Sequence, residues 1–395
     1  MELSHIILLL LIGFLVFTID KKQNNFPVPM VLVLVGIGLS FFAFFAGVEP
    51  SEQLIHDWFL PAVLFTAAYQ FNINWLKKNA GIIAVIGTIG IIIGVLLLGS
   101  SIYLLGLASL TFTGALLIAS ILTPIDSVSV ISIQQEADQD DKVKEVVEGE
   151  SLASDGTSIV IFGIVSAMFM GHEDFQFSSF LSDFFIKAGG GALIGFLLSW
   201  IFMKVLHVVK HHHYQVMLSL ILAYSSFQIA EYFHLAGLLA VISAGLTLSW
   251  ELDRSDPEKE YRRFLDGFWE VIEPAILSLI FLMIGIEFLS HLNLEDVWSI
   301  LIVFTLTLII RFIMVTVLTT INPKWRRKFN WAELALLTVS GIKGTVSVAL
   351  LLSLASGETR EIETILSIAF GVVILSIVLQ SLAIYPLSKR MSQNS

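Results

Sequence analysis

The stretch that decides the fold is Glu148-Gly149-Glu150-Ser151-Leu152-Ala153-Ser154-Asp155-Gly156-Thr157, with three carboxylates and three hydroxyl groups. An apolar run follows it up to Met170. If residues 146–170 form one helix, it has about 25 residues and a length of roughly 37 Å, which crosses a bilayer. Asp155 then lies roughly 15 Å from the polar end. An acidic group at that depth needs a partner or a water-filled cavity, so Asp155 is predicted to be functional.

Helical spacing arranges the other polar side chains around Asp155. Residues at i, i+4 and i+7 share one face of a helix, and here these are Ser151, Asp155 and Ser158. Glu150 and Ser154 form the neighbouring stripe of the same helix.

The composition is that of a membrane protein. Hydrophobic residues make up 56% of the 395 positions and charged residues 14%, and the mean hydropathy is +0.86. A soluble domain carries about 25% charged residues. We therefore predict an all-α polytopic membrane protein in the lipid bilayer, with residues 1–395 forming a single integral membrane domain. The 33 acidic and 22 basic residues, without a basic tail, argue against nucleic-acid binding.

Apolar segments recur along the whole chain and predict about thirteen transmembrane helices. They cover residues 5–19, 27–47, 56–74, 79–103, 107–134, 146–170, 184–206, 214–232, 235–251, 266–289, 297–321, 331–355 and 362–387. Most of the lysines and arginines fall in alternate loops between these segments. The positive-inside rule then predicts an outside N-terminus and a cytoplasmic C-terminus in the cell membrane.

Two of the predicted helices are interrupted. Pro124 precedes Ile125 and Asp126 in the fifth segment, and Ser340-Gly341-Ile342-Lys343-Gly344-Thr345 interrupts the twelfth. These segments occupy matching places in two six-helix repeats, at about 5–170 and 214–387, joined by a linker helix at about 184–206. An offset of seven helices inverts the second repeat. Paired broken helices in inverted repeats indicate a transporter with its site near the membrane midplane.

Two basic residues lie deep within apolar segments. Arg311 and Lys343 each sit about twelve to fourteen residues into a predicted helix and need an internal partner. For Arg311, a role as a structural brace and a role in the ion path both stay open.

Several motifs in this chain resemble the monovalent cation:proton antiporter-1 family of sodium/proton exchangers. The most specific is Gly149-Glu150-Ser151-Leu152-x-x-Asp155-Gly156. The other matching stretches are Phe26-Pro27-Val28-Pro29, residues 60–65, residues 234–240 and residues 278–285. Together they cover nearly the whole chain. The resemblance implies a homodimer whose protomers contain two crossed, broken helices, the fifth and the twelfth.

The same resemblance implies roles for individual residues. Asp155 would bind the proton or the cation. Ser151, Asp126 and the Ile125 carbonyl would be further ligands of the transported Na⁺, with Asp155 and Asp126 as its two carboxylates. Glu150 would pair with Lys343, which stands where family members usually carry arginine. Ser154 stands where they usually carry asparagine, and it keeps the single-acid pattern that goes with electroneutral exchange.

The predicted function is therefore secondary active exchange of Na⁺, with Li⁺ or K⁺ as alternatives, for protons in pH and sodium homeostasis. An electrogenic variant stays open, because a buried lysine, unlike arginine, can release a proton. An ion channel would need an open pore without proton coupling. An intramembrane aspartyl protease could use Asp126 and Asp155, but the chain has no Gly-x-Gly-Asp loop.

No enzyme activity, cofactor or nucleotide is expected. The run Gly189-Gly190-Gly191 lacks the lysine of a phosphate-binding loop, so ion gradients would drive transport. A histidine cluster after the seventh segment, at His207 and His211 to His213, is interpreted as an interfacial anchor. A pH sensor or a metal clip is the alternative.

Overall fold

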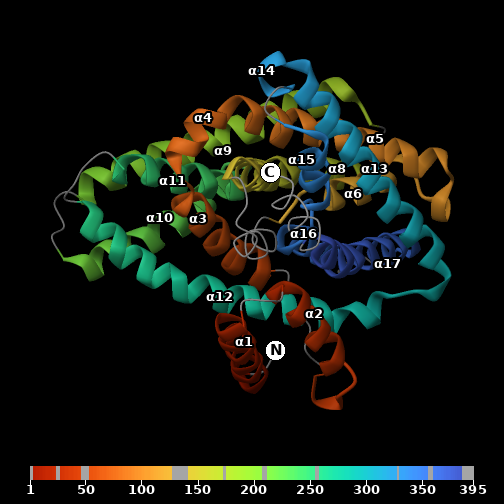
Figure 1. The fold of residues 1–395 in the computed structure, drawn as a ribbon, viewed down its shortest axis with the longest axis horizontal. Coiled ribbons are helices and arrows are strands. Elements are labelled where there is room, and N and C mark those ends of the chain that lie inside the picture. Colours follow the sequence, from red (N-terminus) through yellow and green to blue (C-terminus); the bar gives the residue numbers. More distant parts are fainter. Residues whose placement is uncertain are drawn as a thin grey trace. The chain divides into compact units, whose positions relative to one another are not determined.

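The computed structural model describes residues 3–23, 27–45, 53–126, 141–171, 175–206, 211–253, 258–326, 329–354 and 359–384. In this part of the chain the regular elements are all helical, as Figure 1 shows, which confirms the all-α prediction. The α-helices are α1 (Leu3–Gln23), α2 (Val28–Leu39), α3 (Leu60–Gln70), α4 (Ile73–Ala84), α5 (Ile91–Leu104), α6 (Phe112–Leu122), α8 (Asp141–Met170), α9 (Phe177–Leu206), α10 (His212–Tyr232), α11 (Gly237–Leu252), α12 (Glu258–His291), α13 (Val297–Ile321), α14 (Pro323–Arg326), α15 (Trp331–Val339), α16 (Thr345–Leu352) and α17 (Arg360–Leu375). The π-helical turns are η2 (Leu54–Phe59), η3 (Val85–Gly90) and η6 (Ser376–Gln380).

Seven helical stretches among the described residues are long and apolar enough to cross a membrane, which makes the protein a multi-pass membrane protein. Shorter apolar helices cover Val28–Leu39, Phe112–Leu122 and Gly237–Leu252. The count of thirteen spans stays a prediction. The second predicted segment differs in extent, because α2 ends at Leu39, where the Ser40 hydroxyl bonds back to the Ile37 carbonyl at 2.7 Å.

The chain divides into two compact units. The first comprises Met1–Glu52, Gly81–Phe175 and Ser278–Ser395, and the second comprises Gln53–Ala80 and Gln176–Leu277. Two of the four boundaries fall inside α4 and α12, and each predicted repeat contributes residues to both units. The inverted symmetry between the repeats stays a prediction.

In the second unit, α11 packs against α9 and α3. The helices come close because the contact positions are small. A Cβ atom at Gly245 would lie 2.8 Å from the Ala68 side chain of α3. The Ser243 hydroxyl also donates to the Ala192 carbonyl of α9 at 2.7 Å. Small residues and hydroxyl bonds of this kind hold helices together in membranes.

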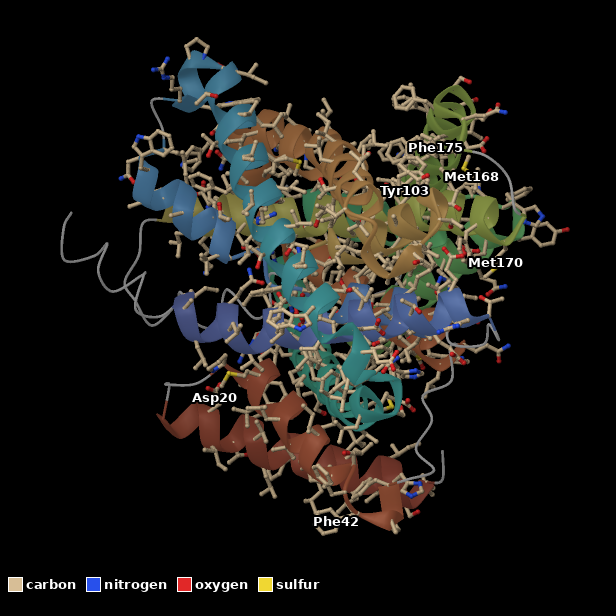
Figure 2. The ribbon with its side chains drawn as sticks, turned by 90° about the vertical axis from the view of Figure 1, so that its right-hand side faces the viewer. Asp20, Phe42, Tyr103, Met168, Met170 and Phe175 are labelled. Carbon is tan, nitrogen blue, oxygen red and sulfur yellow. The ribbon has the colours of Figure 1, made fainter. Side chains whose placement is uncertain are left out.

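In the first unit, α6 packs against α5, α8 and α17, and α13 packs against α5, α15 and α17. Aromatic rings close one end of this group. Phe112, at the start of α6, lies 5.5 Å from Tyr103 and 5.9 Å from Phe175, and Figure 2 labels both of these neighbours. These contacts join the last turn of α5, the start of α6 and Phe175.

Two non-helical stretches follow short helices in the first unit, and the predicted fifth segment beyond residue 126 lies outside the described residues. The α6 break (residues 123–126) follows the end of α6 at Leu122, and the α15–α16 break (residues 340–344) separates the two short helices visible in Figure 1. The predicted interruption of the twelfth segment is thereby confirmed. The two breaks touch, because the Asp126 N–H donates to the Ile342 carbonyl at 2.8 Å. The crossing of two complete broken helices stays a prediction.

Candidate functional site

The site is built on α8, which runs unbroken from Asp141 to Met170 and so contains the whole predicted segment 146–170. Its residues Glu150, Ser151 and Ser154 are buried, whereas Asp155 is half-buried. Within the described part of the chain, the Asp155 carboxylate has no hydrogen bond and no ion pair. A carboxylate in this state can accept a proton or a cation without first losing a protein partner.

Two hydroxyl groups of α8 bind the backbone N–H and the backbone carbonyl of Ile125 in the α6 break. The Ser151 hydroxyl donates to the Ile125 carbonyl at 3.1 Å, and the Ile125 N–H donates to the Ser154 Oγ at 3.4 Å. Ser154 in turn donates to the Ser151 carbonyl at 2.9 Å. The structure therefore brings the predicted hydroxyl and the predicted carbonyl together. Each still has oxygen lone pairs for a hard cation, which prefers oxygen ligands.

Asp126 lies beside these groups and is 6% exposed. Its carboxylate fills the space where Gly344 would carry a Cβ atom, so no larger residue fits at that position. Gly344 is the N-cap of α16, and the positive end of the helix dipole favours a negative charge there. Asp126 is also near enough to Asp155 for the two negative charges to repel each other.

The partner of Glu150 is Arg311 of α13, and the predicted pairing with Lys343 is wrong. Arg311 Nη1 lies 2.8 Å from Glu150 Oε1, and Nη2 lies 3.1 Å from Oε2. The planar guanidinium matches a carboxylate at two points, whereas an ammonium group offers a single charged nitrogen. Arg311 also donates to the Leu337 and Thr338 carbonyls at the end of α15. This geometry is that of a structural brace.

Lys343 is buried in the α15–α16 break, with 4% of its surface exposed. Its ammonium group has no hydrogen bond or ion pair among the described residues, although the charges of Arg311 and Glu150 act on it. Lys343 and Arg311 line a small cavity of about 20 Å³, which Thr123 of the α6 break also lines. A space of this size holds one water molecule.

Sequence reasoning missed two polar residues near the site. Ser376 and Gln380 lie at the two ends of η6; Ser376 accepts from the Lys343 N–H in the α15–α16 break, and Gln380 donates to the Val339 carbonyl at the end of α15. A glutamine inside an apolar span is the signal that could have found them, because a buried amide needs partners.

A second cavity, of about 1000 Å³, lies between the turn before α6, the turn before α13 and the start of α17. Its lining includes four acidic residues, Glu295, Asp296, Glu361 and Glu363, and one arginine, Arg360. One oxygen of the Glu361 carboxylate, Oε1, accepts hydrogen bonds from the Thr111 N–H and from the Thr111 hydroxyl, each at 2.7 Å. A cavity lined by negative charge raises the local concentration of cations.

The predicted histidine cluster lies partly outside the described residues, since His207 and the His212 side chain are not described. The His211 ring packs edge-on against Tyr214, with 5.7 Å between the ring centres. His213 is exposed on α10. The anchor role stays a prediction.

Comparison with known proteins identifies relatives along the whole chain. The family described as "Sodium/hydrogen exchanger, transmembrane" matches residues 6–390. The Na⁺/H⁺ antiporter NhaG of Bacillus atrophaeus is 31% identical, over 100% of this chain and 75% of that protein. The Na⁺/H⁺ antiporter NhaH of Halobacillus dabanensis is 28% identical, over 98% of this chain and 97% of that protein. Among solved structures, the sodium proton antiporter MjNhaP1 from Methanocaldococcus jannaschii at pH 8 has a similar fold, with a TM-score of 0.80, 20% identity and 98% coverage of both chains.

Proposed function

This chain belongs to the sodium/hydrogen exchanger family, and on that basis we propose that it exchanges Na⁺ for protons across the cell membrane, with Asp155 as the shared binding group. The observation that carries the assignment is the state of Asp155. It is half-buried, has no hydrogen bond or ion pair among the described residues, and belongs to the same α8 helix as the site hydroxyls. Family membership indicates the reaction, and the Asp155 carboxylate is the group at which we propose that the proton and Na⁺ bind.

Exchange follows from competition for one negative charge. A proton and a Na⁺ cannot both neutralise Asp155, so binding of one releases the other. The empty site carries an uncompensated negative charge, which is costly to move across the membrane barrier. Conformational change is therefore favoured only when a proton or a Na⁺ occupies the site, and this condition couples the two fluxes. Asp126, the Ser151 hydroxyl and the Ile125 carbonyl are the proposed additional ligands of Na⁺.

The charges around the site favour electroneutral exchange. Glu150 and Arg311 cancel each other in their ion pair. Among the remaining groups, a charged Lys343 and the carboxylates of Asp126 and Asp155 sum to one uncompensated negative charge. One Na⁺ or one proton therefore restores neutrality. In this scheme Lys343 keeps its proton throughout the transport cycle.

One observation favours a second stoichiometry. Glu150 forms its ion pair with Arg311, so Lys343 lacks an ion-pair partner among the described residues. A lysine in that position could release its proton when Na⁺ binds, and each turnover would then move charge. K⁺ and Li⁺, the predicted alternatives to Na⁺, would bind at the same site.

The oligomeric state and the membrane orientation of the protein are also part of the proposal. We take it to work as a homodimer in the cell membrane, with its N-terminus outside and its C-terminus in the cytoplasm. The family resemblance supports the dimer, and the distribution of lysine and arginine among the loops supports the orientation. The scheme uses ion gradients alone, requires no cofactor, and contributes to pH and sodium homeostasis.

Reconstitution in proteoliposomes tests the proposal. An imposed Na⁺ gradient should drive proton movement in the wild type, as read by a trapped pH-sensitive dye. Asp155→Asn keeps the shape of the side chain but removes its charge, and it should abolish this movement while the protein elutes as a folded species. Normal exchange by Asp155→Asn would falsify the assignment.

A further inference from the structure

The α15–α16 break leaves backbone groups without their helical partners. In a continuous helix, the Lys343 N–H would donate to the Val339 carbonyl four residues earlier. Here α15 ends at Val339, and α16 begins only at Thr345. Lys343 is buried and Val339 is half-buried, and an N–H or carbonyl left unpaired away from water is costly.

Two side chains replace this missing hydrogen bond. The Lys343 N–H donates to Ser376 Oγ at 2.9 Å, and the Ser376 hydroxyl donates to Gln380 Oε1. Gln380 Nε2 then donates to the Val339 carbonyl at 2.9 Å. The chain of bonds therefore starts and ends on the two groups that the break separates. We name Ser376 and Gln380 the bridging pair.

The bridging pair comes from a distorted turn. Ser376 and Gln380 are the first and last residues of η6, and they are 1% and 4% exposed. π-helical turns are rare and occur often at functional sites. The α17 helix, which leads into η6, packs against α16.

The bridged segment also sets the position of Asp126. The Ile342 carbonyl, one residue before Lys343, accepts from the Asp126 N–H at 2.8 Å. Gly344, one residue after Lys343, lies against the Asp126 carboxylate. A shift of this segment would therefore move Asp126 relative to Asp155.

We propose that Ser376 and Gln380 are positioning residues that hold the α15–α16 break open and thereby fix Asp126 in the cation site. The inference rests on the proposed function, because it takes Asp126 as a ligand of the transported Na⁺. The pair itself touches neither the cation nor Asp155 in this account. Its effect reaches the site through Ile342 and Gly344.

A purely structural role predicts a different result from a positioning role. If the pair only satisfied buried polar groups, its loss would lower thermal stability and leave the KM for Na⁺ unchanged. If the pair positions Asp126, its loss raises the KM, while the maximal rate at saturating Na⁺ changes much less.

The test compares Ser376→Ala, Ser376→Thr and Gln380→Leu in proteoliposomes, with KM and maximal rate measured over a range of Na⁺ concentrations. Ser381→Ala is the matched control, because Ser381 follows Gln380, is 1% exposed and has no hydrogen-bond partner in the described residues. Loss of one buried hydrogen bond changes an equilibrium by about fivefold. We therefore expect Ser376→Ala and Gln380→Leu to raise the KM at least about fivefold, and Ser376→Thr, which keeps the hydroxyl, to remain near wild type.

The outcomes separate this inference from the proposed function. If the wild type exchanges Na⁺ for protons and Asp155→Asn does not, but Ser376→Ala has the KM of Ser381→Ala, the positioning role is wrong and the function stands. If Asp155→Asn exchanges normally, the proposed function fails first. Should Gln380→Leu not fold, the comparison of Ser376→Ala with Ser376→Thr decides the positioning role alone.

Discussion

Arg311 of α13 and Glu150 of α8 form a bidentate ion pair that is almost closed to solvent, with oxygen–nitrogen distances of 2.8 and 3.1 Å. Glu150 is 1% exposed and Arg311 6% exposed. Glu150 immediately precedes Ser151 along α8, and Arg311 also donates to the Leu337 and Thr338 carbonyls at the end of α15. The pair thus connects α8, which carries Asp155, to the broken helix that positions Asp126.

The first prediction concerns the stability of this pair. Glu150→Gln leaves the Arg311 charge buried without a counter-charge, which costs about 3–5 kcal/mol. Arg311→Gln should cost a similar amount. In the double variant Glu150→Gln/Arg311→Gln neither charge remains, so the loss should be well below the sum of the single losses. Thermal unfolding in detergent measures the cycle.

The control for that cycle is Lys343→Gln combined with Glu150→Gln. Since Lys343 makes no ion pair with Glu150, their coupling should be clearly smaller than that of the Arg311 cycle. Strictly additive losses for Glu150 and Arg311 would contradict the pairing.

How much of this arrangement the sequence could predict differs from residue to residue. The length of the apolar run after Glu150 predicted α8, and the glycines around Lys343 predicted the α15–α16 break. That Arg311 and Lys343 are buried was also predictable. The sequence could not predict which of these two side chains pairs with Glu150, because that depends on how α13 and α15 rotate and pack against α8. The roles of Ser376 and Gln380 could not be predicted either, because their hydrogen-bond partners are backbone groups of a segment distant in the sequence.

The second prediction concerns the hydroxyl at the site. Ser151→Ala removes the group that holds the Ile125 carbonyl and is a proposed ligand of Na⁺. Loss of about 1 to 1.5 kcal/mol of interaction raises the KM for Na⁺ by about five- to tenfold. The maximal rate should change less. Initial rates in proteoliposomes provide both constants.

Ser120→Ala is the matched control for Ser151→Ala. Ser120 is equally buried, and its hydroxyl donates to Leu117 within its own helix at 2.7 Å. The control should retain the wild-type KM. An equal rise in both variants would mean that loss of a buried hydroxyl, rather than loss of a ligand, changes Na⁺ binding.

The third prediction uses two glycines that differ in their surroundings. A Cβ atom at Gly344 would overlap the Asp126 carboxylate, whereas one at Gly163 on α8 meets no atom within 4 Å. Gly344→Ala should therefore displace Asp126 and reduce exchange by at least about tenfold, since it removes a charged ligand interaction. Gly163→Ala should keep wild-type exchange and stabilise α8 by up to about 1 kcal/mol. Full activity in Gly344→Ala would argue against the proposed place of Asp126.

The fourth prediction concerns stoichiometry. If Lys343 keeps its proton, exchange moves no net charge, and the steady-state Na⁺ ratio should follow the pH gradient alone. Proteoliposomes with the voltage clamped by valinomycin and K⁺ provide this measurement. Lys343→Arg, which cannot lose its charge, should behave in the same way. A ratio that shifts with voltage in the wild type, but not in Lys343→Arg, would instead make Lys343 a second proton carrier.

The central claim is that one proton and one Na⁺ compete for Asp155, and calorimetry of Na⁺ binding to the purified protein tests it most directly. Protons compete more strongly as the pH falls, so the apparent Kd for Na⁺ should rise, approaching about tenfold per pH unit once Asp155 is mostly protonated. Titrations in buffers of different ionisation enthalpy should then show about one proton released for each Na⁺ bound. Asp155→Asn should lose both the binding and the proton release. Na⁺ binding that is independent of pH, or that persists with proton release in Asp155→Asn, would contradict the account.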